Sequence, residues 1–305
     1  FRALVADKLP ESQRSYGFVL QTLIIGIGTW IASNLPWLVN KMGFTEEAAP
    51  GVVPEYVKIA FGIGAMVFLI SILYTVLKTK EYPPKDLETC KKEKKENRFV
   101  HDFLFSLKNM PVTMKKLGLI QFFSWFAFFT MWSMATPALT DYVYKAPAPD
   151  KTAFDFSIPA QEQAFNIANK AFQTASDNVG SAMGIYGLSS MVFALLLTFY
   201  AAKRSVNRKL VHMFSLVAGG VGFLLMGLGQ ASLLNISFIL IGISWGSILS
   251  MPYAMLSSSV DEKRMGMMMG LFNMFIVIPQ IIAALGGINF LSELISKSSI
   301  APMIL

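Results

Sequence analysis

A stripe of amide, aromatic and hydroxyl side chains runs along one apolar segment near the middle of the chain. Its members are Gln121, Trp125, Phe128, Trp132 and Thr136. At about 100° of rotation per residue, this spacing places all of them on one face of a helix. Amide and hydroxyl groups can bond to the hydroxyls of a ligand, while indole rings can cover its apolar face. The alternative is that the rings pack against neighbouring helices or anchor a helix at a membrane surface.

A second pair of amides occurs in the last apolar segment. Asn273 and Gln280 lie two helical turns apart on one face. Amides in an apolar environment need hydrogen-bond partners, so this pair either binds a ligand or bonds across helices. Pro279 removes a backbone donor, which predicts a kink beside Gln280.

Charged side chains flank the first and last apolar segments. Arg2 lies near the start of the chain, and a charge within a membrane span usually faces a cavity or a partner. The alternative for Arg2 is a side chain that reaches to the membrane surface. Asp7 and Arg14 precede the first segment as Asp261 and Arg264 precede the last, in similar short sequences.

Seven apolar segments are long enough to cross a membrane, because about 20 helical residues span the hydrocarbon core. They are Ser15–Val39, Val57–Leu77, Leu117–Leu139, Ser181–Ala202, Leu210–Leu228, Ile236–Leu256 and Met265–Leu285. The composition agrees, with 54% hydrophobic and 15% charged residues and a mean hydropathy of +0.51. The predicted fold is an all-α integral membrane bundle of about seven transmembrane helices.

Basic clusters occupy every second connection between these segments. They are Lys8 with Arg14, the stretch Lys78–Lys116, Lys203 to Lys209, and Lys263 with Arg264. Lys and Arg prefer the cytoplasmic side, so we expect these connections inside a cell (inner) membrane. This placement explains the net charge of +7 better than binding to nucleic acid, which we do not expect.

Several other functions are excluded by what the sequence contains. A single cysteine, Cys90, and two histidines, His101 and His212, offer no internal disulfide and no His-based metal site. We expect no cofactor and no metal. Gly242 to Gly246 fits the GxSxG pattern of hydrolases, but it lies within an apolar segment and no histidine follows it. We interpret that match as chance and expect close helix packing at Gly242, Gly246 and Ser250.

The stretch Lys78–Lys116 divides the chain into parts 1–77, 78–116 and 117–305. Within it, the charged residues 80–97 predict a solvated linker. Apolar residues at helical spacing then predict an amphipathic helix from Arg98 that breaks near Pro111. Residues 161–174 of the long connection after Leu139 favour a short helix. We expect the chain to be a fragment, with spans missing before Phe1 and one missing after Leu305.

Three stretches of the chain resemble the major facilitator superfamily, and within it the glycoside cation symporters, which include sucrose and α-glucoside transporters. Residues 1–7 (FRALVAD) resemble the inner end of the fourth helix of these proteins. Residues 110–127 resemble the entry to the seventh helix. Residues 252–254 (PYA) and 273–280 (NMFIVIPQ) resemble the tenth and eleventh helices.

This resemblance implies a truncated major-facilitator-type bundle, with helices 4 to 6 in residues 1–77 and helices 7 to 11 in residues 117–305. It implies cation-coupled symport of a glycoside or disaccharide by alternating access, with the proton as the favoured cation and a monomer as the working unit. It also implies that Arg2 takes part in binding or coupling. Asp7, Arg14, Asp261 and Arg264 would form a cytoplasmic gate. The alternatives are an exporter of drugs or metabolites from the same superfamily, and an integral-membrane transferase.

Overall fold

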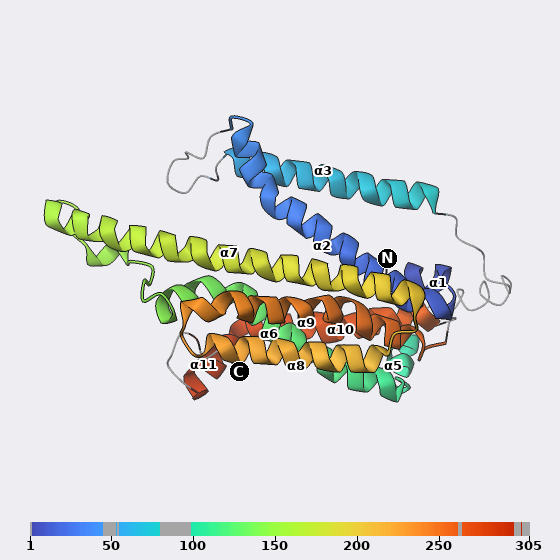
Figure 1. The fold of residues 1–305 in the computed structure, drawn as a ribbon. Helices are drawn as coiled ribbons and strands as arrows, with labels where there is room; N and C mark the ends of the chain where they lie inside the picture. The colour runs from blue at the N-terminus through green and yellow to red at the C-terminus, as the bar shows by residue number, and fades with distance from the viewer. Residues whose placement is uncertain are drawn as a thin grey trace. The chain divides into compact units, whose positions relative to one another are not determined.

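The computed structural model describes residues 2–44, 53, 55–79, 99–261, 264–295 and 300. Every regular element within these residues is a helix (Figure 1), and seven of the helices are long and apolar enough to cross a membrane. The predicted all-α membrane bundle with seven spans is therefore confirmed. The predicted linker at residues 80–97 lies outside the described residues.

The chain divides into two compact units, Phe1–Gly26 with Ser106–Leu305, and Ile27–Phe105. The second unit holds the end of α2 (Glu11–Lys41), α3 (Glu55–Lys78) and most of α5 (Phe99–Lys108). Most of the apolar side chains of α3 are exposed. A helix that is apolar on all sides suits a hydrocarbon environment.

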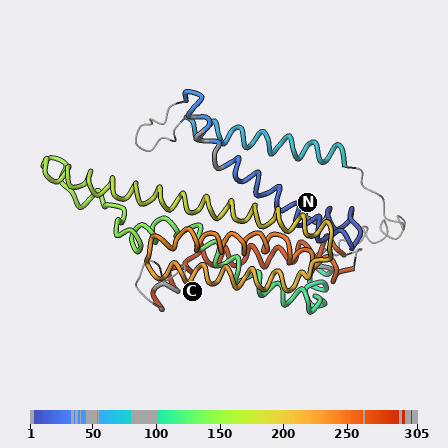
Figure 2. The backbone as a smooth tube through the Cα atoms, viewed as in Figure 1, coloured from blue at the N-terminus to red at the C-terminus, as the bar shows by residue number. Residues whose placement is uncertain are grey.

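The first unit is a bundle with α9 at its centre. Its helices are α1 (Arg2–Lys8), the start of α2, α6 (Val112–Tyr142), η1 (Lys151–Ala153), α7 (Pro159–Lys203), α8 (Arg208–Met226), α9 (Ala231–Ser257), α10 (Met265–Ile282), the π-helical η3 (Ala283–Gly287) and α11 (Ile288–Ile295). Helix α9 packs against α6, α7 and α8, while α10 packs against α6; Figure 2 shows the backbones of these helices running alongside one another. The core between them includes Met131 and Leu139 of α6, and Phe238, Ile241 and Ile248 of α9.

Small residues let α9 approach α7 closely. A Cβ atom built on Gly242 would lie 2.4 Å from the carbonyl oxygen of Tyr186, and one on Gly246 would lie 2.8 Å from Phe193 Cδ1. Ser250 is buried further along the same helix. The prediction of close packing through this series is confirmed. The GxSxG match lies in the middle of α9, not in the strand-to-helix turn that a hydrolase needs.

We predict opposite effects for two Gly→Ala substitutions in neighbouring helices. Gly242→Ala should lower the stability by about 1–3 kcal/mol, because its methyl group meets fixed backbone of α7. Gly220→Ala should be neutral or raise the stability by up to about 1 kcal/mol, because no atom lies within 4 Å and alanine favours a helix. Apparent unfolding temperatures in detergent measure both. Equal effects of the two substitutions would contradict the tight packing at Gly242.

Helix α7 is longer than expected from the sequence. It runs without interruption from Pro159 to Lys203 and includes residues 161–174, which we expected to form a separate helix. The polar stretch around Asp177 does not end it, because Ala175 and Val179 are buried on one face. Its 45 residues extend about 68 Å, so its first turns pass beyond the ends of α8 and α9 (Figure 1).

Two prolines were expected to break or kink helices, Pro111 and Pro279. The break near Pro111 is confirmed, because α5 ends at Lys108 and α6 begins at Val112. Pro279 lies inside α10. The kink that follows falls at Gly286, where φ is 115° within the π-helical segment. Glycine adopts that angle at little cost, so this kink has a cause of its own, and the kink expected beside Gln280 stays a prediction.

Candidate functional site

The aromatic residues of the predicted α6 stripe converge on a tryptophan of α9. Trp245 lies 5.1 Å from Trp125, 5.0 Å from Trp132 and 5.0 Å from Phe128, measured between ring centroids. The Trp125 and Trp132 rings are themselves 6.1 Å apart. These spacings are typical of attractive aromatic pairs. Three of the five tryptophans of the chain therefore form one cluster.

The cluster continues onto two further helices. Phe128 also lies 6.3 Å from Tyr186 of α7 and 5.9 Å from Phe223 of α8. Exposure differs among the rings of the α6 stripe: Phe128 is 2% exposed, Trp125 is half-buried, and Trp132 is 36% exposed. Thr136, the last member of the stripe, is half-buried. The indole of Trp132 is thus the most exposed ring of this cluster.

Gln121 begins the stripe one helical turn before Trp125, and it is fully buried. Among the described residues, neither its Oε1 nor its Nε2 atom has a hydrogen-bond partner, and the same holds for the buried Nε1 atom of Trp125. Buried polar groups without partners are costly and uncommon. One acceptor and two kinds of N–H donor therefore remain available beside the aromatic cluster.

The two amides of the second predicted pair make different kinds of hydrogen bond. Asn273 of α10 is exposed, and its Oδ1 atom accepts a hydrogen bond of 3.2 Å from the hydroxyl of Tyr253 on α9. The Tyr253 ring also stacks on Phe18 of α2, with centroids 6.1 Å apart. Gln280 instead donates to the carbonyl oxygen of Ile276 within α10, at 2.9 Å. Only Asn273 of the pair thus bonds across helices.

Two arginines bind the carbonyl groups at the C-terminal end of α9. Arg14 of α2, which is 6% exposed, donates to the Ser257 carbonyl oxygen at 2.9 Å. Arg208 of α8 donates to the Ala254 carbonyl oxygen at 2.7 Å and to Ser15 Oγ at 2.6 Å. The last carbonyls of a helix lack partners within it and carry partial negative charge. The two guanidinium groups therefore connect α2, α8 and α9 at one end of the bundle.

The other predicted gate residues lie near the same end. Arg264, just before α10, donates to Ser106 Oγ at 2.6 Å. Asp7 in α1 and Asp261 before α10 are both exposed. Arg2 begins α1, but its side chain lies outside the described part of the chain.

Trp245 and Arg208 were not predicted as site residues from the sequence, and His212 was considered only as a metal ligand. Trp245 was treated only as part of a GxSxG match, although a tryptophan in the middle of an apolar segment is a usable signal. Arg208 was assigned to a topology-setting cluster. His212 of α8 is buried and lies 3.0 Å from Ser247 Oγ of α9 through its Nδ1 atom. Within the described residues, no three His, Cys, Asp or Glu side chains gather in a way that would hold a metal ion.

The sequence model of the Major Facilitator Superfamily matches residues 1–284. The chain belongs to this superfamily. Its members are transporters, so the chain is a multi-pass membrane transporter and its partners include the lipid bilayer and a small-molecule substrate. No curated protein matches the chain. In a transporter, the aromatic cluster and the unpaired amide are candidates for solute binding and not for covalent chemistry.

Proposed function

We propose that this transporter carries out cation-coupled symport of a glycoside or disaccharide, with the proton as the favoured cation. The observation that supports this most directly is Gln121, whose buried amide has no partner beside three clustered tryptophans. A sugar presents hydroxyl groups at its rim and apolar C–H groups on its ring faces. Unpaired amides and exposed indole faces match those two chemistries.

Each site residue has a distinct role in this proposal. Trp132 and Trp245 cover the ring face of the sugar, and Gln121 with the Trp125 N–H group bonds its hydroxyls. Asn273 lies at the margin, where the Tyr253 hydroxyl fixes the direction of its amide. Arg2 and Gln280 remain proposed contacts from the family resemblance. For Gln280, binding would require its amide to leave the Ile276 carbonyl oxygen.

Alternating access follows from the two halves of the superfamily fold. We place the halves in residues 1–77 and 117–305, joined by residues 78–116. The arginine contacts at the end of α9 support a gate there, to which Asp7, Asp261 and Arg264 contribute charge. The positive-inside preference puts this end in the cytoplasm of a cell (inner) membrane, and the protein works as a monomer.

Tryptophan fluorescence tests the proposed site directly, because the cluster holds three of the five tryptophans. Titrating the purified full-length protein with an α-linked disaccharide should give a saturable change in emission. The Gln121→Met variant should lose that change. If the emission changes with lipophilic cations but not with sugars, the result would favour the exporter alternative.

Removing the Trp132 ring is expected to lower the affinity for sugar moderately. Trp132→Ala should weaken sugar binding roughly 3- to 10-fold, because one accessible aromatic face is removed. Trp132→Phe should recover most of the affinity. Trp30→Ala is the matched control, since that tryptophan is also exposed but lies outside the cluster. Equal weakening by the Trp30 and Trp132 substitutions would contradict a sugar-covering role.

A second comparison separates the sugar symporter from the exporter. In an exporter with an apolar cavity, replacing Gln121, Asn273 or Gln280 with Ala leaves transport unchanged. In the proposed symporter, Gln121→Ala and Asn273→Ala both reduce sugar uptake. Uptake of labelled disaccharide by cells that produce the full-length variants measures the difference.

A further inference from the structure

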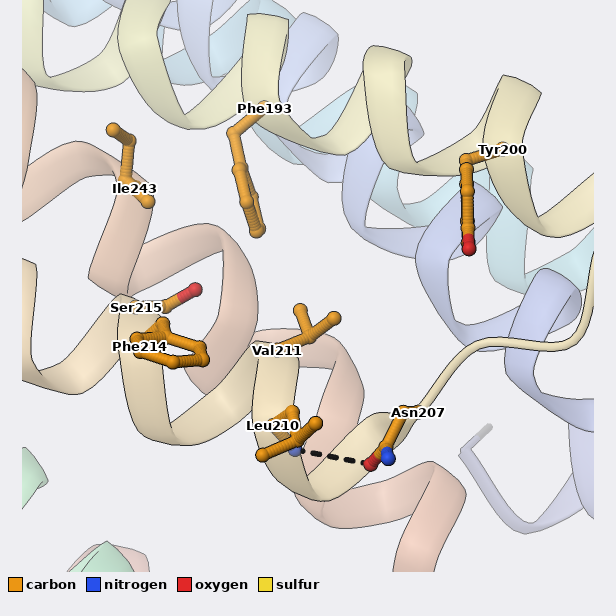
Figure 3. Close-up of a pocket in the computed structure, with 8 residues that line it drawn as sticks. All are labelled: Phe193, Tyr200, Asn207, Leu210, Val211, Phe214, Ser215 and Ile243. Atoms are coloured by element: carbon orange, nitrogen blue, oxygen red, sulfur yellow. Dashed lines mark hydrogen bonds between the residues drawn. The ribbon is translucent and has the colours of Figure 1, made fainter.

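A groove of about 420 Å³ lies between α7 and α8, with α9 beneath it. Its wall contains Phe193 of α7, Leu210, Val211 and Phe214 of α8, and Ile243 of α9. Figure 3 shows Phe193 pointing from α7 towards α8. The volume falls in the range of about 300–1,000 Å³ that is typical of small-molecule sites. This groove is separate from the aromatic cluster at Trp245.

The groove is mostly apolar in its middle, where the small hydroxyl of Ser215 is the one polar lining group and is buried. The larger polar side chains, Tyr200 and Asn207, lie towards the helix ends (Figure 3). The Asn207 side chain caps α8 by accepting a hydrogen bond from the Leu210 backbone N–H. A groove with an apolar middle and polar groups at a membrane surface complements a phospholipid. Its apolar part suits the hydrocarbon chain, and its polar end suits the head group.

Positive charge gathers at the polar end of the groove. Lys203 and Arg204 follow Tyr200 within one helical turn, and Lys209 directly precedes Leu210. All three side chains are exposed. Arg208 lies between them but donates to Ala254 and Ser15 instead. Lys and Arg near a membrane surface attract anionic lipid head groups, so the charge complements such a head group.

The geometry points to a binding site for one anionic phospholipid of the surrounding membrane. Its acyl chain lies in the groove against Phe193, Leu210 and Phe214. Its phosphate lies at the α7–α8 connection, within reach of Lys203, Arg204 and Lys209. Because Arg208 ties this same connection to the end of α9, a bound lipid would stabilise the helix ends that meet there.

Native mass spectrometry of the purified full-length protein tests the head-group part of this site. The protein is titrated with phosphatidylglycerol and, separately, with phosphatidylcholine. The triple variant Lys203→Glu, Arg204→Glu, Lys209→Glu should lose roughly 10- to 100-fold in affinity for phosphatidylglycerol. The control variant Lys108→Glu, Lys115→Glu, Lys116→Glu carries the same charge change on exposed residues outside the groove. If both variants lost the same affinity for phosphatidylglycerol, the proposed site would be wrong, because any exposed basic residues would then attract the lipid equally.

A second pair of variants tests the acyl-chain part. Leu210→Trp puts a larger side chain into the groove, whereas Val217→Trp changes an exposed residue of the same helix that does not line it. Leu210→Trp should remove the tightly bound phosphatidylglycerol, and Val217→Trp should keep it. If both variants keep the lipid, the groove does not hold the chain and the proposal is wrong. Size-exclusion chromatography checks whether each variant is folded.

Discussion

Gln121→Met should make the protein more stable and at the same time abolish most of the sugar uptake that we propose for it. The Gln121 amide is fully buried, and neither of its polar atoms has a partner among the described residues. Replacing it with a thioether side chain of similar size removes a desolvation cost of about 1–3 kcal/mol. If the amide binds a sugar hydroxyl during transport, uptake should fall about 10- to 100-fold. Unfolding temperature and initial uptake rate are the two measurements.

Stability is expected to rise while sugar uptake falls, and this combination makes the substitution informative. A purely structural Gln121 predicts higher stability with unchanged uptake, which would contradict a binding role. Gln280→Met is the matched control, because the Gln280 amide already donates to the Ile276 carbonyl oxygen. That control should give no comparable gain in stability. Functional sites commonly retain such destabilising groups because binding requires them.

Arg14→Ala should weaken the connection between α2 and α9 and reduce transport. The buried guanidinium donates to the Ser257 carbonyl oxygen and, through Nε, to the Ala6 carbonyl oxygen at 3.2 Å. Charged hydrogen bonds of this kind contribute about 1.5–3 kcal/mol each. Arg14→Lys should recover only part of the loss, because an ammonium group cannot reproduce the planar set of donors. Unfolding temperature measures the stability, and disaccharide uptake measures the transport.

The control for this prediction is Lys116→Ala, which removes an exposed basic side chain of α6. It should change the stability by less than about 0.5 kcal/mol. Adding Arg208→Ala to Arg14→Ala should deepen the loss, because both side chains bind carbonyls of the same helix end. An Arg14→Ala variant with normal stability and normal uptake would show that the contact is dispensable.

Helix α9 links the candidate binding site to the proposed gate. Trp245 lies in the aromatic cluster, and Ser257 twelve residues later accepts the Arg14 hydrogen bond. At about 1.5 Å per residue, these positions are roughly 18 Å apart along the helix axis. Because α9 packs tightly against α7 at Gly242, we expect these two helices to move together. A shift of this pair that releases the arginines would therefore also move Trp245 relative to the α6 stripe.

The sequence predicted the features that depend on local pattern. Hydrophobic length identified seven spans, spacing placed Trp125, Phe128 and Trp132 on one face, and small residues indicated the close approach at Gly242. Contacts between distant segments were not predictable in this way. Trp245 meets the stripe, and Arg208 reaches Ala254, only because α6, α8 and α9 pack together.

The length of α7 was missed for a related reason. A polar stretch near Asp177 has the composition of a connection, but burial of Ala175 and Val179 keeps it helical. Tertiary burial overrides local preference in such cases. The position of the kink near Gly286 likewise depends on a backbone angle that the sequence around Pro279 does not specify.

Disaccharide uptake is the most direct test of the central proposal. Proteoliposomes that contain the full-length protein are given an inward proton gradient and a radiolabelled α-linked disaccharide. The account predicts accumulation above the external concentration, which a protonophore removes and the Gln121→Met substitution strongly reduces. Accumulation that persists with the protonophore would contradict the proton as coupling ion. The absence of any glycoside uptake would contradict the proposed function itself.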